Sequence, residues 1–187
     1  MDADDYMTYE EFGRKFFEVA VTEDRVGGAI AAIAGDAFEM GPIGQGPGKI
    51  AKVTAKVRIM DPRVVRTVGE MITFDIRIPL EIDMVVDLRI DRPKFMVFGE
   101  IALRATARAA APLLLILDVE KPRSSDISIH VTSKSLRAEV VRVLGGIDAE
   151  IRRFIAAHVS GEIDSPASKT AKIIDVADRL DAAWTGI

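Results

Sequence analysis

The chain of 187 residues contains no cysteine. This excludes a disulfide framework, a thiolate nucleophile and any metal site built on cysteine. Aromatic residues make up only 6% of the chain, and histidine occurs twice. Basic charge is not in excess either, since 25 basic and 29 acidic residues leave a net charge of −4. A nucleic-acid partner needs a basic surface with aromatic platforms, so none is predicted.

Long hydrophobic runs are also missing. The longest apolar stretch, residues 109–117, is far shorter than the roughly 20 residues that cross a bilayer. The acidic start of the chain, MDADDYMTYEEF, has neither the basic nor the apolar segment of a secretory signal. We therefore expect a cytoplasmic protein without a membrane anchor.

Short catalytic and cofactor motifs are not found. The glycine-rich segment 41–49 has Ile43 and Ile50 where a phosphate-binding loop requires glycine and Ser/Thr, so we interpret it as a connecting loop. His130 and His158 each stand without a second ligand at metal-binding spacing. No metal or cofactor is predicted, and the sequence favours a non-catalytic protein while leaving the question of an enzyme open.

The strongest pattern is a strict alternation over residues 72–90, where every even position is apolar. Period two predicts a strand with one dry, apolar face and one wet, polar face. The acidic residues of the wet face alternate with arginines on the same and on other strands. We expect these groups to form cross-strand ion pairs rather than a catalytic set. The acidic residues concerned are Asp75, Glu81, Asp83 and Asp87.

Helical patterns flank a central series of alternating segments. Residues 8–34 predict two helices, the first starting at a capping box of Thr8 and Glu11 and the second at Thr22. Residues 49–132 predict a meander of antiparallel strands, and residues 134–160 and 168–185 predict C-terminal amphipathic helices. Residues 60–71 predict a short helix or an irregular crossing, and Gly145-Gly146 a kink or break. The order predicts one domain of the α+β class, residues 1–187.

The length of the alternating stretch limits its shape. Nineteen strand residues span about 60 Å, whereas a compact protein of this size is about 40 Å across. The strand must therefore curl, bend or extend the molecule, and Pro79 and Gly99 are the expected positions of a bend, bulge or close approach. The dry face could be covered by the chain's own helices, by a partner, or by an apolar ligand in a groove.

An N-terminal helix, long strands with one apolar face and a long C-terminal amphipathic helix follow one another over about residues 12–159. This pattern resembles the tubular lipid-binding (TULIP) superfamily, which includes the bactericidal permeability-increasing protein, synaptotagmin-like mitochondrial lipid-binding domains and related actinobacterial proteins. The resemblance implies a long, highly curved antiparallel sheet wrapped around a long amphipathic helix, with an apolar tunnel between them. The lining residues that it implies are Phe74, Ile76, Ile78, Leu80, Ile82, Met84, Val86, Val97, Ile101, Leu103, Leu115, Leu117, Val140, Leu144, Ile147 and Ile151.

The functional prediction is a protein that binds, and in one version transfers, a lipid or another long hydrophobic molecule. The alternative is an assembly protein that buries its apolar sheet face in a homodimer or against a partner protein. A transient membrane contact is left open. The C-terminal extension 165–187, with Trp184, lies outside the resemblance and could cap the groove or dock a second subunit.

Overall fold

The computed structural model describes residues 6–35, 37–45, 51–88, 90–131 and 138–184. Within these ranges, the side chains of residues 45, 131, 138–142 and 144 are outside the described part. The described elements confirm the α+β class. They are α1 (Tyr9–Ala20), α2 (Glu23–Ala34), β1 (Ala37–Gln45), β2 (Ala51–Ile59), β3 (Arg63–Val68), β4 (Ile72–Asp87), β5 (Lys94–Ala110), β6 (Leu114–Val119), η3 (Ser124–Asp126), β7 (Ile127–Val131), α3 (Ala138–Asp164), α4 (Pro166–Lys172), β8 (Ile173–Asp175) and α5 (Val176–Trp184).

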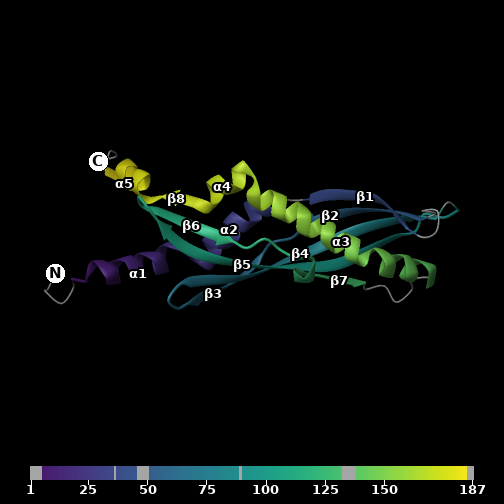
Figure 1. Cartoon of the computed structure of the whole chain (residues 1–187), viewed down its shortest axis with the longest axis horizontal. Helices are drawn as coiled ribbons and strands as arrows, with labels where there is room; N and C mark the ends of the chain where they lie inside the picture. Colours follow the sequence, from purple (N-terminus) through teal and green to yellow (C-terminus); the bar gives the residue numbers. More distant parts are fainter. Residues whose placement is uncertain (1–5, 36, 46–50, 89, 132–137, 185–187) are drawn as a thin grey trace.

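Two long strands form the spine of the antiparallel sheet. β4 has 16 residues and β5 has 17, and they pair along almost their whole length. Each long strand pairs with two shorter strands in succession on its other side: β4 with β3 and then β2, and β5 with β7 and then β6. The molecule is correspondingly elongated along this spine (Figure 1).

Pro79 lies where the partner of β4 changes from β3 to β2. The Pro79 carbonyl accepts a hydrogen bond from Met60 N at 2.9 Å, in the connection between β2 and β3. In an antiparallel strand the N–H and C=O of one residue point to the same side, so the donor that proline lacks falls in this gap. Pro79, a predicted position of a bend, bulge or close approach, therefore marks a change of strand partner within the continuous strand β4.

Gly99 is a position of close approach, as predicted. It lies in the dry face of β5, between Leu80 of β4 and Ile129 of β7. A Cβ atom on Gly99 would be 2.8 Å from the carbonyl oxygen of Ser128. Only glycine allows the β7 backbone to lie at this distance.

Two segments that the sequence predicted as irregular are strands. Residues 41–45 belong to β1, which pairs with β2 and has a bulge between Met40 and Ile43. Gly41 in the bulge has φ = +102°, and Pro42 follows it. Both residues are tolerated in this strand because β1 lies at an edge of the sheet. Residues 63–68 form β3, where valines at 64, 65 and 68 favour strand over helix.

The C-terminal prediction needs two corrections. α3 runs without a break through Gly145 and Gly146. The predicted last helix is divided into α4 and α5 by the short strand β8, which pairs with β6. The β-branched pair Ile173-Ile174 completes this edge of the sheet, and tertiary pairing overrides the helical pattern.

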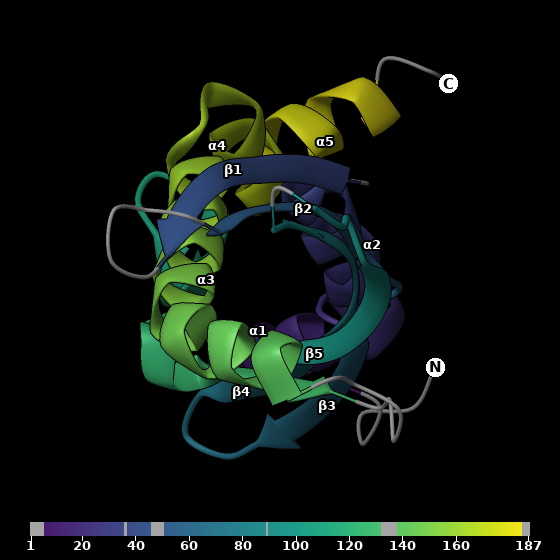
Figure 2. The ribbon, with the colours of Figure 1, turned by 90° about the vertical axis from the view of Figure 1, so that its right-hand side faces the viewer.

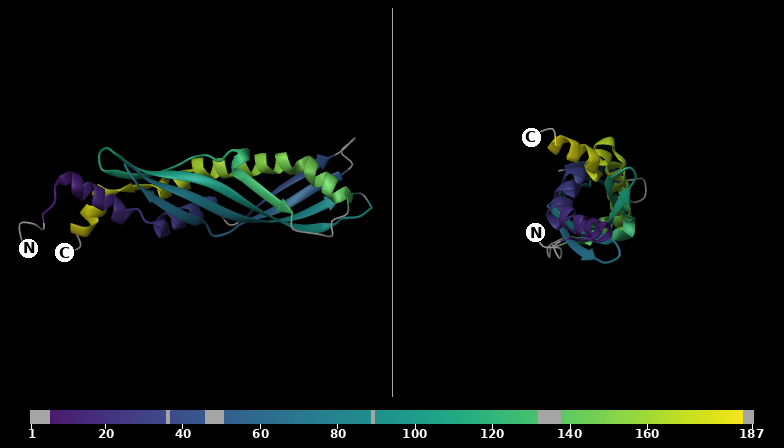
Figure 3. Two further views of the ribbon diagram at one scale, coloured as in Figure 1. Left: turned by 90° about the horizontal axis from the view of Figure 1, so that it is seen from below. Right: turned by 90° about the vertical axis from the view of Figure 1, so that its left-hand side faces the viewer.

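The sheet curls strongly into a half-barrel. Viewed along the long axis, the strands follow part of a ring, and α3 lies on a remaining side (Figure 2). α3 contacts β1 and β7, and α2 contacts α3, α4 and β3. Both described ends of the chain, α1 and α5, lie at the same end of the molecule (Figures 1 and 3). The elongated shape of the molecule accommodates the length of β4 and β5, and the curl of the sheet gives their dry faces a common interior.

The N-terminal start signals are confirmed. Thr8 Oγ1 accepts from Glu11 N at 3.2 Å, and the Glu11 carboxylate accepts from Thr8 N at 2.8 Å. These reciprocal bonds form the predicted capping box of α1. Thr22 Oγ1 caps α2 by accepting a hydrogen bond from Arg25 N at 3.3 Å, and Gly35 with φ = +74° follows the last turn of this helix.

Candidate functional site

The predicted dry face of β4 forms the core. From Ile72 to Val86, every inward residue has an exposed fraction between 0% and 7%. These side chains are shielded from solvent, so the middle of the dry face belongs to the core. The same buried cluster includes these predicted lining residues: Phe74, Ile76, Ile78, Leu80, Ile82, Met84, Val86, Val97, Ile101, Leu103, Leu115, Leu117, Ile147 and Ile151. The side chains of Val140 and Leu144 lie outside the described part of the structure.

The inward side chains of β5 become smaller toward its C-terminal end. Leu103 is followed on the same face by Ala105, Ala107 and Ala109. Their neighbours on both sides are large, because β4 places Phe74 and Ile72, and β6 places Val119, Leu117 and Leu115, directly opposite these alanines. The alanines therefore form a low row between larger apolar side chains, which we call the trough; Ala105 and Ala107 are buried in it and Ala109 is exposed.

The trough ends at an open cavity of about 480 Å³ beside α1. Its apolar lining includes Phe17 of α1, Val68, Met71 and Ile72 around the β3–β4 turn, and Ala107 and Ala109 of β5. We call this the α1-end pocket. Its volume falls in the range of about 300–1,000 Å³ that is usual for small-molecule sites. Here the dry face leaves the packed core and meets solvent.

Charged residues surround the apolar lining of the α1-end pocket. Arg14 and Glu10 of α1 pair at 3.4 Å, and Arg108 of β5 pairs with Asp118 at 2.8 Å. All four side chains are exposed, so these pairs contribute little to stability. They keep the rim of the pocket hydrated while its floor is apolar.

Two arginines hold α1 in place over the pocket. Arg66 Nη1 donates to the carbonyl oxygens of Glu18 and Val21, at 2.8 and 2.9 Å. Arg25 Nη1 donates to the carbonyl oxygens of Val19 and Ala20, at 3.2 and 2.8 Å. These carbonyls end the helix and have no partner within it, so the two guanidinium groups act as its C-terminal cap.

The wet face carries the predicted cross-strand ion pairs. Arg58 contacts Glu81 at 2.9 Å and Asp83 at 3.3 Å, and Arg104 contacts Asp75 at 3.5 Å. Asp87 pairs at 3.0 Å with Arg92 in the turn between β4 and β5, so this pair does not join two strands. The predicted cross-strand ion pairs are confirmed for Asp75, Glu81 and Asp83.

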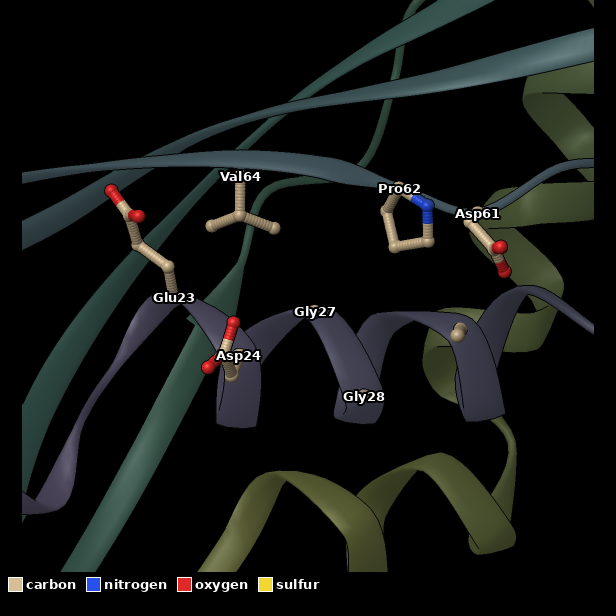
Figure 4. A pocket seen from close by; sticks show the side chains of 8 residues that line it. Glu23, Asp24, Gly27, Gly28, Asp61, Pro62 and Val64 are labelled. Carbon is tan, nitrogen blue, oxygen red and sulfur yellow. The ribbon is translucent and has the colours of Figure 1, made fainter.

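A second open cavity, of about 370 Å³, lies between α2 and β3. Glu23 and Asp24 come from α2 and Asp61 from the connection before β3, and Figure 4 shows their carboxylates pointing in different directions. The Glu23 carboxylate already has a hydrogen-bond partner, because it accepts from Arg66 N at 2.8 Å. Within the described residues, no three acidic or histidine side chains gather closely enough to hold a metal ion.

Sequence reasoning missed two parts of the site. It did not place α1 beside the end of β5, because α1 is far from β5 in the chain. Nothing in the pattern of α1 indicates which strand it lies beside. Sequence reasoning also did not use the decrease in side-chain size from Leu103 to Ala109, which is visible in the sequence and leads to the α1-end pocket.

Comparison with known proteins adds no relative: no protein-family model and no curated protein matches this chain. Among the described helices, none has both the length and the apolar character needed to cross a bilayer.

Proposed function

We propose that this protein binds a lipid-like amphiphile, whose apolar part lies in the alanine-floored trough and whose polar end stays at the rim of the α1-end pocket. The observation that carries the proposal is the gradient on β5, from Leu103 in the packed core to Ala109 at the open end. A trough floored by alanines and walled by Ile72 and Leu117 fits a narrow, flexible chain better than a broad, rigid molecule. The hydrated rim suits the polar end of an amphiphile.

The length of the ligand depends on α3 in this proposal. Ile147 and Ile151 of α3 belong to the same buried cluster as the dry face of β4. A short chain fits the α1-end pocket beside Ala107 and Ala109. A longer chain reaches the lining predicted from the sequence by displacing these α3 side chains. This version corresponds to the tubular lipid-binding arrangement that the sequence pattern resembles.

The assembly alternative requires a surface other than the apolar sheet face that the sequence suggested. Within a single copy the dry face is already covered, because its side chains from Ile72 to Val86 are buried. A surface for assembly therefore has to come from apolar groups outside the curl.

Native mass spectrometry of the protein purified from cells tests the proposal. We expect a mass excess over the chain that organic extraction removes, with acyl species in the extract. The purified, extracted protein should then take up a fluorescent fatty-acid probe. A chain of unmodified mass with no extractable ligand and no probe uptake would contradict ligand binding.

A further inference from the structure

The dry face of the sheet is open to solvent at the edge next to the α1-end pocket. Ala109 of β5 lies opposite Leu115 of β6, which in turn lies opposite Ile174 of β8, so the three side chains point to the same face. Leu115 is buried, but Ala109 is exposed and Ile174 has an exposed fraction of 42%. The apolar interior of the curl is therefore incompletely covered at this edge.

α5 begins at this open edge. The Val176 N–H donates to the carbonyl oxygen of Leu113 at 3.0 Å, and the Asp175 carboxylate accepts from Asp178 N at 3.2 Å. These two hydrogen bonds fix the first turn of α5 beside the start of β6. None of the nine residues of α5, all of which the structure describes, is buried.

One side of α5 leads from the core into solvent. Val176, Leu180 and Trp184 follow one another at intervals of four residues, so they lie within about 80° of one another around the helix. Val176 packs against the core, whereas Leu180 and Trp184 have exposed fractions of 49% and 77%. We call these three residues the apolar side of α5. It begins on the core and continues without cover.

The α1-end pocket is an apolar surface within reach of α5. Neighbouring strands lie about 4.8 Å apart, so β8 is about 10 Å across the sheet from β5, whose Ala107 and Ala109 line the pocket. The nine residues of α5 are about 14 Å long, which is enough to span this distance. α5 and α1 lie at the same end of the molecule (Figures 1 and 3). Met71, which also lines the pocket, is 51% exposed and offers an apolar contact at its mouth.

We propose that α5 closes over the α1-end pocket, so that Leu180 and Trp184 contact the bound amphiphile. The proposal rests on ligand binding at this pocket and supplies the wall that the open cavity lacks. It also assigns to residues 176–184 the capping role that the sequence left open for the C-terminal extension. The helix turns about the junction of β8 and α5, at Asp175 and Val176, where the backbone changes from extended to helical.

The ligand favours the closed position of α5 in this proposal. With the pocket occupied, closing removes the apolar side of α5, Met71 and the ligand from water together. With the pocket empty, the same movement encloses a void, and the side chains around a void lack contact partners on one side. Because the ligand interacts better with the closed position, binding shifts the equilibrium toward it.

Trp184 is the only tryptophan of the chain, so its fluorescence reports on α5 alone. Oleate is added to the full chain while isothermal titration calorimetry measures binding and acrylamide quenching measures the accessibility of Trp184. At saturation we expect the emission of Trp184 to shift to shorter wavelength and its quenching constant to fall at least twofold. Oleate binding with no change in Trp184 would overturn the closing of α5 and leave the proposed ligand binding intact. If no oleate binds, the proposed ligand binding fails and this inference fails with it.

Introduced cysteines test the closed position directly, because the chain has none of its own. Arg14 lines the pocket from α1, and its side chain is exposed. With oleate bound, a short bismaleimide should join Arg14→Cys to Trp184→Cys within one chain at least five times faster than it joins Arg14→Cys to Asp178→Cys. Asp178 is the matched control, since it is exposed on the opposite side of α5.

Two further results would overturn the proposal. One is an equal rate of cross-linking for the two cysteine pairs, or cross-links that form only between two chains, which would make α5 a contact between copies. The other is a Trp184 that phosphatidylcholine vesicles shield from acrylamide while oleate does not, which would make α5 a membrane contact.

Discussion

The guanidinium of Arg66 donates a hydrogen bond to the carbonyl oxygen of Val21 at 2.9 Å, and so joins β3 to the residue that follows α1. No residue of α1 is fully buried, and Phe16, Phe17 and Ala20 are only partly buried against the core, so polar contacts of this kind help to fix where the helix lies. The position of α1 in turn decides one wall of the α1-end pocket.

Removing this contact should loosen α1. Arg66→Met leaves the carbonyls of Glu18 and Val21 without donors, and hydrogen bonds to charged groups contribute about 1.5–3 kcal/mol. We expect the free energy of unfolding to fall by about that amount in urea titrations, with faster amide exchange over residues 9–20. Arg63→Met, on the exposed part of the same strand, should change it by less than about 0.5 kcal/mol. Equal losses in the two variants would show that the cap does not hold α1.

The two glycine positions Gly99 and Gly145 should respond oppositely to alanine. Gly99→Ala brings a Cβ to 2.8 Å from Ser128 O and should lower the free energy of unfolding by about 1–3 kcal/mol. A Cβ at Gly145 meets nothing within 4 Å in the interior of α3, so Gly145→Ala should raise it by about 0.5–1 kcal/mol. Thermal unfolding of both variants checks the signs. A neutral Gly99→Ala would contradict the close approach of β7.

The capping box of α1 should make this helix sensitive to acid. Hydrogen bonds from the backbone N–H and then the hydroxyl of Thr8 hold the pKa of the Glu11 carboxyl below its ordinary value of 4.5. A lowered pKa in the folded state means that the stabilisation is complete above pH 4.5 and is lost as pH falls through the lower, folded value. Amide exchange of residues 9–12 should therefore accelerate on acidification in this range.

Glu11→Gln is the control for this pH effect. It removes the carboxyl that titrates, so amide exchange of residues 9–12 should no longer respond to acid in this range. The same acid response in Glu11→Gln and the wild type would assign the effect to another group.

The middle of the dry face should behave as core. Ile78 is 1% exposed and lies opposite Ile101. Ile78→Asp places an unpaired carboxylate there, which costs several kcal/mol, so cooperative thermal unfolding should be lost. Thr73→Asp, on the wet face of the same strand, should keep it. If Ile78→Asp instead folds normally and loses only ligand uptake, the middle of the stripe is itself the ligand site.

The strands and helices with strong periodicity were predictable from the sequence. The alternation over 72–90 correctly predicted β4 through Asp87, and Thr8 and Thr22 marked the starts of α1 and α2. β1, β3 and β8 were missed because Gly41, Pro42 and the short lengths of β3 and β8 weaken the local pattern. Their strand form depends on pairing with neighbours that a single segment does not reveal.

The candidate site was predictable only in part. The pattern identified which face is apolar, since packing repeats at every second residue. It did not identify where that face is open, because opening depends on which distant element covers it. Ile78 and Ala109 lie on the same face of neighbouring strands, yet α2 lies over the first and only the α1-end pocket adjoins the second.

The most direct test of ligand binding at the α1-end pocket is the uptake of a fluorescent fatty-acid probe by two variants of β5. Ala109→Phe fills the pocket from its exposed floor, whereas Ala102→Phe makes the same change on the opposite, wet face of the strand. Both variants should unfold cooperatively, near the wild-type temperature. We expect the dissociation constant of the probe to be at least ten times higher for Ala109→Phe than for the wild type, and unchanged for Ala102→Phe. Equal probe affinity in the wild type and both variants would contradict ligand binding at the α1-end pocket.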